Sequence, residues 1–479
     1  MAKRADNRET GLKRKLSPVN VWALALGCII GWGAFVMPGN KFLITAGPLG
    51  TAIAMAVAAV IMIVLAFNYD YMINIYPEAG GGFAFARHSF GRNHAFVCSW
   101  FLGLSYLTIV PLNATALALL GRNLLGNVFQ FGFHYTVAGY DIYCGELLLA
   151  VAALVIFAWI NIRDIKFSGG FQTILVFALV AGVAIIGAGA LISPQTSMAS
   201  LAPAFHPDVA PIAGILAIIA IAPWTFLGFD TIPQAAEEFN FSPRKTKAIM
   251  IISLLFGGLV YVVLNTVTAA VVPEGYAGWP EYLADLPNLH GVKSLPTFNA
   301  AYQILGRAGL IFLGVAVLAA ILSGIVGFYM ATSRLLYAMA RHQYLPKWFG
   351  TLHPKYNTPK NAVIFVMLIS LTAPFFGRSA LNWIVDMSSI GAAIGYGYTS
   401  AAAFKHARKE KKYGIAASGA LGVLISLAFC VLLLIPIGNL GCSLGPEAYI
   451  CLGIWTVLGI IFYFSSRKGM EEETSSKEI

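Results

Sequence analysis

The sequence predicts an all-α membrane protein with twelve transmembrane helices. Of its 479 residues, 58% are hydrophobic and only 11% are charged, whereas roughly 25% are charged in an ordinary soluble domain. A soluble globule leaves much of its surface in water, so it could not hide this much apolar surface. The few charges are also clustered, and they leave long stretches without Asp, Glu, Lys or Arg.

These charge-free stretches are the candidate membrane helices, since crossing the hydrocarbon core of a bilayer takes roughly 20 apolar residues. In chain order they are 16–40, 42–69, 93–121, 147–162, 167–207, 209–229, 248–273, 308–333, 361–377, 387–404, 413–446 and 448–466. The fourth, ninth and tenth are short, but each can extend past a flanking charge whose side chain reaches the interface. The fifth ends in the polar run 193–197, so we expect one helix and then a loop.

Basic residues lie mostly in alternate loops, which sets the expected orientation because cytoplasmic loops carry the excess of Lys and Arg. With a cytoplasmic N-terminus, only five of the 31 basic residues face outward: Lys41, Arg122, Lys293, Arg307 and Arg378. Both termini are then cytoplasmic. The net charge of +10 follows from this topology and from contact with anionic lipid, so no nucleic-acid partner is expected. The first apolar stretch is too long for a cleavable signal peptide, and the short tails favour a bacterial inner membrane.

Two of the stretches carry helix-breaking residues in their middle. The breaking residues are Gly27, Gly31 and Gly33 in the first stretch and Pro223 and Gly228, followed by Asp230, in the sixth. Unpaired backbone at membrane depth is costly unless it lines a wet cavity or contacts a ligand. Glycines also let helices pack closely, but spans one and six occupy matching positions in two five-helix halves. That placement indicates a transporter binding site between inverted repeats.

Four short motifs follow one another along the chain. They are Gly27-x-Ile29-x-Gly31-x-Gly33-x-Phe35, Pro77-Glu78-Ala79-Gly80-Gly81, Trp224 to Asp230 with Ala235-Ala236-Glu237-Glu238, and Ser333 to Arg341 with Leu345-Pro346. Together they resemble the amino acid/polyamine/organocation (APC) transporters. The resemblance implies a leucine-transporter-like fold in which 17–192 and 208–405 form two inverted five-helix repeats, with spans one and six broken. Two further helices in 413–466 and cytoplasmic tails at 1–16 and 467–479 complete the expected organisation.

An amino acid zwitterion needs one partner for its carboxylate and another for its ammonium. Amide N–H groups freed at the break of span one lie at the start of a half-helix, where the partial positive charge suits a carboxylate. The resemblance implies that the carboxylate binds there and that carbonyls freed in span six receive the amino group. Carried over to this chain, the substrate-binding residues are Ile30, Gly31, Trp32, Gly33, Trp224, Phe226 and Gly228.

The two tryptophans of this set leave alternatives open. Trp32 stands where the family usually has a small residue, so its indole either packs away from the cavity or fills part of it and restricts the substrate. Trp224 matches the aromatic gate of the bacterial arginine/agmatine exchangers, and its ring face can contact a cation. A packing or interface tryptophan is the alternative for Trp224.

Asp230 is the strongest single candidate, because 21 uncharged residues precede it. An ionisable group at membrane depth is a functional hypothesis by default, and the resemblance to the exchangers suggests proton sensing or cation selection. The alternative is a hydrated cap at the helix break. Glu237 and Glu238 are expected at the cytoplasmic end, beside Arg244 and Lys245.

The coupling ion is less well indicated. Ser323 in span eight offers a hydroxyl for a sodium site, or only a bond to its own helix. Several proton-coupled relatives carry a lysine in span five in place of a sodium ion, but residues 167–192 contain no Lys or Arg. Exchange of one substrate for another, which needs no ion, is therefore favoured.

Enzymatic activity has little support in the sequence. The eight histidines lie in loops or at span ends, no Cys or His pair has metal-ligand spacing, and no phosphate-binding loop is present. We expect a secondary transporter for amino acids or related amines, a permease or an exchanger, without cofactor or resident metal. Its partners are the small-molecule substrate and the lipid bilayer, and a homodimer is left open. A receptor on a transporter fold without turnover is the alternative class, which the short tails disfavour.

Overall fold

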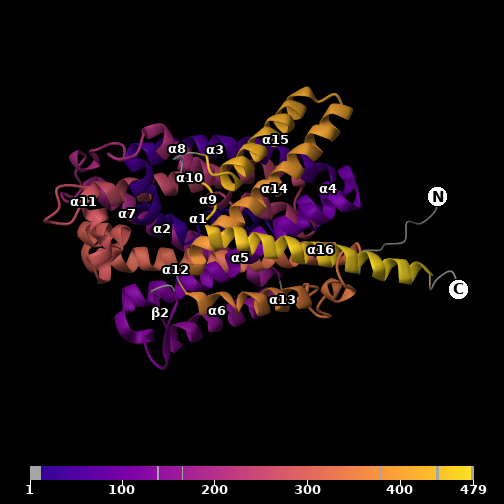
Figure 1. The fold of residues 1–479 in the computed structure, drawn as a ribbon, viewed down its shortest axis with the longest axis horizontal. Coiled ribbons are helices and arrows are strands. Elements are labelled where there is room, and N and C mark those ends of the chain that lie inside the picture. The colour runs from indigo at the N-terminus through magenta and orange to yellow at the C-terminus, as the bar shows by residue number, and fades with distance from the viewer. Residues whose placement is uncertain (1–11, 138–139, 164, 378, 438–441, 476–479) are drawn as a thin grey trace.

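The structure is a computed structural model that describes residues 12–137, 140–163, 165–377, 379–437 and 442–475 (Figure 1). Most of these residues are helical. The helices of the first part of the chain are α1 (Pro18–Ile30), α2 (Gly33–Met37), α3 (Leu43–Ile75), α4 (Gly82–Phe90), α5 (Arg92–Leu125), α6 (Cys144–Ile162) and α7 (Ile165–Ile192). Those that follow are α8 (Pro211–Ala220), α9 (Ala222–Thr225), α10 (Thr246–Ala270), α11 (Trp279–Ala284), α12 (Pro296–Arg341), α13 (Lys360–Ser370), α14 (Ser379–Lys409), α15 (Tyr413–Leu434) and α16 (Pro446–Ser475).

Each predicted apolar stretch coincides with helix, but the helices do not all stand alone. In the described chain, eight helical segments are long and apolar enough to cross a membrane. One of them, Pro18–Ile75, contains both the first and the second predicted stretch, because α2 continues through a π-helical turn into α3. The sixth and ninth stretches form shorter apolar helices, Pro211–Ala220 and Lys360–Phe376. The number of spans therefore stays a prediction.

Outward-facing apolar side chains support a lipid environment for these helices. Leu191, Ile212 and Ile174 expose 89%, 74% and 69% of their surface, respectively. Large contiguous apolar surfaces are rare on soluble monomers. Many of the helices bury small and polar residues against one another. The low content of charged residues therefore suits both the apolar exterior and the packed interior.

The first broken span lies in the middle of the helical body. α1 packs against α7, α10 and α12, and α12 is in turn flanked by α5 and α7. α1 begins with a capping box, in which the Ser17 hydroxyl accepts from the Asn20 N–H and the Asn20 side chain accepts from the Ser17 N–H. Pro18 stands at the first helical position, where its missing N–H costs nothing. The sequence therefore fixes where the first span starts.

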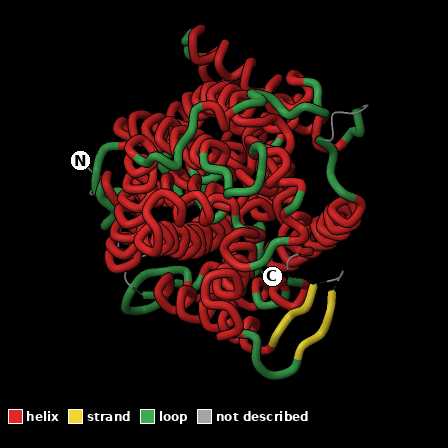
Figure 2. Tube along the Cα trace, turned by 90° about the vertical axis from the view of Figure 1, so that its left-hand side faces the viewer, coloured by secondary structure: helices red, strands yellow, loops and turns green. Residues whose placement is uncertain are grey.

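A small β-hairpin departs from the all-α expectation. Strands β1 (His134–Val137) and β2 (Tyr140–Tyr143) pair antiparallel, with His134 opposite Tyr143. Figure 2 shows the hairpin at the edge of the helical body. The side chains of β1 alternate between exposed and partly buried positions, and the hairpin lies within the loop between two predicted spans.

Candidate functional site

The first span is broken at Gly31. α1 ends at Ile30, and Gly31 has φ 24° and ψ 178°, a conformation that a side chain would strain. α2 begins at Gly33. Near the end of α1, where carbonyls lose their helical partners, the Ile29 carbonyl accepts a hydrogen bond of 3.1 Å from the Tyr261 hydroxyl of α10. The break is therefore an ordered feature held by a neighbouring helix.

The break places amide N–H groups at the start of α2. The first N–H groups of a helix have no carbonyl partner within it, and they carry the positive end of the helix dipole. Trp32 and Gly33 hold this position, and both are buried, as is Ile30. The arrangement suits an anionic group such as a carboxylate.

The sixth span is interrupted as well, and its break contacts the first. α9 ends at Thr225, Gly228 has φ 148°, and a 3₁₀ helix runs over Phe229–Glu238. A Cβ on Gly228 would lie 2.7 Å from the Ile29 nitrogen and 2.8 Å from the Ala25 carbonyl oxygen. Only glycine allows this approach, so the two breaks touch where the sequence predicts a shared site.

Trp224 and Gly33 pack directly against each other across the two spans. A Cβ on Gly33 would lie 2.5 Å from the Trp224 ring, which is itself 8% exposed. Trp224 therefore covers the start of α2. Phe226 is fully buried, with its ring centroid 6.3 Å from that of Tyr261. Trp32 is 7% exposed, and its indole N–H has no hydrogen-bond partner among the described residues.

Asp230 is fully buried, and both of its carboxylate oxygens are engaged. One accepts from the Gly228 N–H at 2.9 Å, and the other accepts from the Tyr106 hydroxyl of α5 at 2.8 Å. The Gln234 amide donates to the Tyr106 oxygen at 3.3 Å. Asp230 does cap the break, as the sequence allowed, but the cap is buried and also ties span six to α5.

Aromatic rings surround the residue before Asp230. The Phe229 ring lies 5.5 Å from both Tyr69 and Tyr396, and Tyr69 and Tyr396 are 6.1 Å apart. These centroid distances are typical of attractive aromatic pairs. Sequence reasoning did not single out Tyr69, because one tyrosine in an apolar helix carries no distinguishing pattern.

Ser323 contacts a side chain that the sequence analysis missed. The Gln172 amide of α7 donates to the Ser323 hydroxyl of α12 at 2.7 Å, and it lies 3.4 Å from the Ala23 carbonyl of α1. A Cβ on Gly27 would collide with the Ser323 oxygen, so α1 and α12 are in close contact here. A polar residue inside the charge-free run 167–192 is the signal that would have indicated Gln172.

Near the end of span six, Glu237 and Glu238 pair with arginines of α12. Glu238 forms a two-point ion pair with Arg334 of α12, at 3.0 and 3.1 Å, and both side chains are almost fully buried. Glu237 pairs with Arg341 at 2.9 Å. In sequence both carboxylates lie close to Arg244 and Lys245. In the structure they pair with Arg334 and Arg341, because α12 extends far enough to bring its own arginines to the end of span six.

A second polar cluster lies at the C-terminal end of α12. Arg87 of α4 donates to Glu78 at 2.8 Å and to the His342 ring at 2.9 Å. Partial burial and the neighbouring Arg87 guanidinium lower the pKa of His342 to about 4. His342 is therefore neutral at pH 7 and serves as an acceptor for Arg87.

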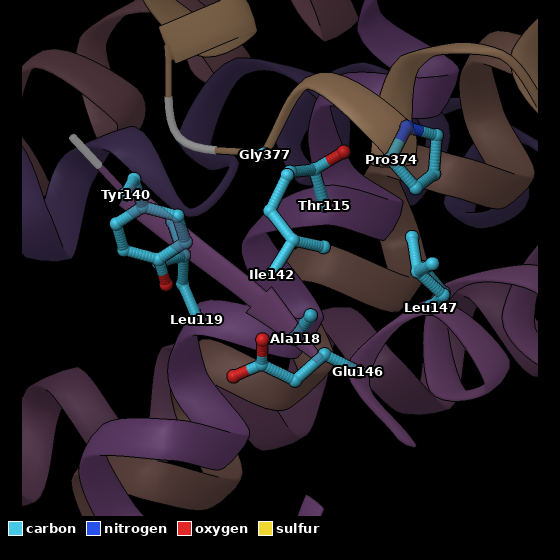
Figure 3. A pocket seen from close by; sticks show the side chains of 10 residues that line it. Thr115, Ala118, Leu119, Tyr140, Ile142, Glu146, Leu147, Pro374 and Gly377 are labelled. Atoms are coloured by element: carbon cyan, nitrogen blue, oxygen red, sulfur yellow. The ribbon is translucent and has the colours of Figure 1, made fainter. Parts of the chain in front are cut away.

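A small pocket lies away from both breaks (Figure 3). It is lined by residues of α5, β2, α6 and the segment before α14, among them Thr115, Tyr140, Glu146 and Gly377. The Glu146 carboxylate is bound at 2.6 Å by the Arg122 guanidinium. None of the predicted substrate-binding residues lines this pocket.

Comparison with known proteins shows which family the chain is similar to. Residues 16–460 match the amino acid permease family. The chain is 29% identical to an uncharacterized transporter of Rhizobium meliloti over 80% of this chain and 77% of the relative. It is 25% identical to the branched-chain amino acid permease BcaP of Bacillus subtilis, over 96% and 94% of the two chains. It is also 25% identical to the low-affinity putrescine importer PlaP of Escherichia coli, over 79% and 78%.

Broken apolar helices that meet at a buried polar centre, together with a family match over nearly the whole chain, confirm the resemblance to APC transporters and the expectation that the protein is not an enzyme. The chain belongs to the amino acid permease family of the APC superfamily and is an integral membrane transporter.

Proposed function

We propose that the chain is a secondary transporter that moves amino acids or related amines by alternating access, and that it works as an exchanger. The observation that carries this proposal is the contact between the two broken spans. Gly228 lies against Ile29 and Trp224 lies against Gly33, so residues at the break of one span contact residues at the break of the other. Such paired breaks are typical of substrate sites at the interface of inverted repeats.

The proposed architecture has twelve spans, with both termini in the cytoplasm of a bacterial cell and the protein in its inner membrane. Residues 17–192 and 208–405 form the two inverted repeats, and the helices of 413–466 lie outside them. The helical segments at every charge-free stretch support this organisation. Rocking of one repeat against the other would expose the breaks to each side in turn.

The residues have distinct proposed roles. N–H groups at Gly31, Trp32 and Gly33 bind the substrate carboxylate, and backbone carbonyls between Trp224 and Gly228 receive its amino group. Trp224 covers the bound molecule, and Ile30 and Phe226 pack against it. Relatives named for branched-chain amino acids and for putrescine support a substrate that carries an amino group.

The surroundings of Ser323 support exchange without a coupling ion. Its hydroxyl is already bound by the neutral Gln172 amide, which also approaches the Ala23 carbonyl. A sodium ion at this position would have to displace that amide. The Gln172 side chain therefore joins α1, α7 and α12 without any bound charge.

Proteoliposomes test the proposal. Vesicles loaded with unlabelled leucine, arginine or putrescine should take up the same labelled compound, with no dependence on a sodium or proton gradient. Vesicles that contain a Gly33→Leu variant serve as the control, because the added side chain collides with Trp224 and should abolish uptake. The transport proposal fails if no compound in a broad panel of amino acids and polyamines enters wild-type vesicles faster than control vesicles.

A further inference from the structure

α10 carries a polar stripe on the face that it turns to the first broken span. Tyr261, Asn265 and Thr268 follow one another at spacings of four and three residues, which places them on one side of a helix. All three side chains are buried, at 2%, 1% and 1% exposure. Polar groups buried in this way normally have hydrogen-bond partners.

The two outer members of the stripe show what this face contacts. The Tyr261 hydroxyl donates to the Ile29 carbonyl at the break, and its ring meets Phe42 edge-on at 5.9 Å. The Thr268 hydroxyl lies 3.0 Å from that of Thr297, in the first turn of α12. Asn265 is one helical turn from Tyr261 and lies between these contacts. It therefore occupies the layer between the break of span one and the start of α12.

Asn265 differs from its neighbours because neither its amide nitrogen nor its amide oxygen has a hydrogen-bond partner in the described part of the chain. Leaving such a group unpaired in a protein interior is unfavourable. Asn68 of α3 provides a contrast, since its amide nitrogen donates to Ser400 at 3.2 Å and to the Ser418 carbonyl at 3.1 Å. Asn265 is therefore about as buried as Asn68, but it lacks the hydrogen bonds that Asn68 makes.

A primary amide offers an acceptor oxygen and two N–H donors. The oxygen suits the ammonium group that amino acids and amines share, and the N–H groups suit the carboxylate of an amino acid. A molecule held at the break of span one would lie one helical turn, about 5.4 Å, along α10 from Asn265.

We propose that Asn265 is a substrate-binding residue whose amide oxygen accepts a hydrogen bond from the ammonium group of the transported amino acid or amine. This inference rests on the proposed transport function. Among the described residues the amide has no partner, and the substrate would supply one. Tyr261 holds the Ile29 carbonyl and keeps the broken backbone in place beside it.

The test is Asn265→Leu, which keeps a similar volume and removes both polar atoms. The purified variant should unfold at the same temperature as wild type or higher, because an unpaired buried polar group is lost. Its KM for exchange of leucine, arginine or putrescine should rise about tenfold or more, as expected for loss of a hydrogen bond to a charged group. Asn68→Leu is the matched control and should show the opposite pattern, a lower unfolding temperature with an unchanged KM.

Binding is measured separately from flux, as the shift in unfolding temperature that each of the three compounds causes. A shift present in wild type and lost in Asn265→Leu supports the assignment even if wild-type vesicles carry out no exchange, an outcome that would reject only the transport proposal. A destabilised or unfolded Asn265→Leu protein, or an unchanged KM and shift, shows that Asn265 is structural and overturns the inference. If wild type shows neither shift nor flux, both proposals fail.

Discussion

At the scale of the residue, Asp230 combines two tasks that the sequence could not separate. An isolated carboxylate at membrane depth indicates function, and the structure shows that the same group also caps the Gly228 N–H and binds the Tyr106 hydroxyl. Its environment is fully buried, with rings of Tyr69 and Tyr396 around the neighbouring Phe229. A change of charge at Asp230 should therefore affect the geometry of the break.

Asp230→Asn should lower the rate of exchange about tenfold, since the amide keeps the acceptor for Gly228 and loses the one for Tyr106. The pH dependence or the cation selectivity of uptake should change with it, because the substitution removes the ionisable carboxyl group at the break. The check is to measure uptake from pH 5 to 8. Asp208→Asn, which removes an exposed carboxylate, is the control. An unchanged profile would reduce Asp230 to a structural residue.

At the scale of the element, Glu238 joins three segments: the one before α1, the end of span six and α12. Its carbonyl accepts from the N–H groups of both Lys15 and Leu16 at 2.9 Å, which ties the segment before α1 to the end of span six. Its carboxylate binds Arg334 of α12. An ion pair is suited to a contact that opens and closes, because water solvates both charges once they separate.

Arg334→Met should destabilise the protein by about 3 kcal/mol, because it leaves the Glu238 carboxylate buried without its partner. The double variant Glu238→Gln with Arg334→Met should regain most of that loss. Arg341→Met removes the exposed partner of Glu237 and should cost about 1 kcal/mol or less. Unfolding in detergent measures these three variants and Glu238→Gln alone. Simple addition of the Arg334→Met and Glu238→Gln losses in the double variant would argue against a coupled pair.

At the scale of the whole molecule, the distribution of charge predicts the orientation in the membrane. The segment 405–412, which includes the end of α14 and the connection to α15, carries five basic residues and one acid. The ends of α4 and α12 meet through Arg87 and His342. The hairpin β1–β2 lies on the loop expected outside. Basic residues favour the cytoplasmic side.

Fusions expressed in a bacterial host test this orientation. Green fluorescent protein fused to the C-terminus should fluoresce, because it folds only in the cytoplasm, and alkaline phosphatase fused there should be inactive. Alkaline phosphatase fused after Ile192 should be active, since the fifth predicted span ends outside. The reverse activities at either position would reject the twelve-span topology.

The sequence by itself determined the membrane environment, the position of every apolar helix and the two breaks. These are local properties: a run of apolar residues must avoid water, and Gly31 and Gly228 adopt positive φ values that other residues avoid. Only the tertiary structure decided which polar groups meet. Gln172 and Ser323 are 151 residues apart in the chain, yet their side chains are hydrogen-bonded, and no periodicity indicates such a pair. The Glu238–Arg334 pair was missed for the same reason, because α12 brings Arg334 to a residue that lies 96 positions earlier in the chain.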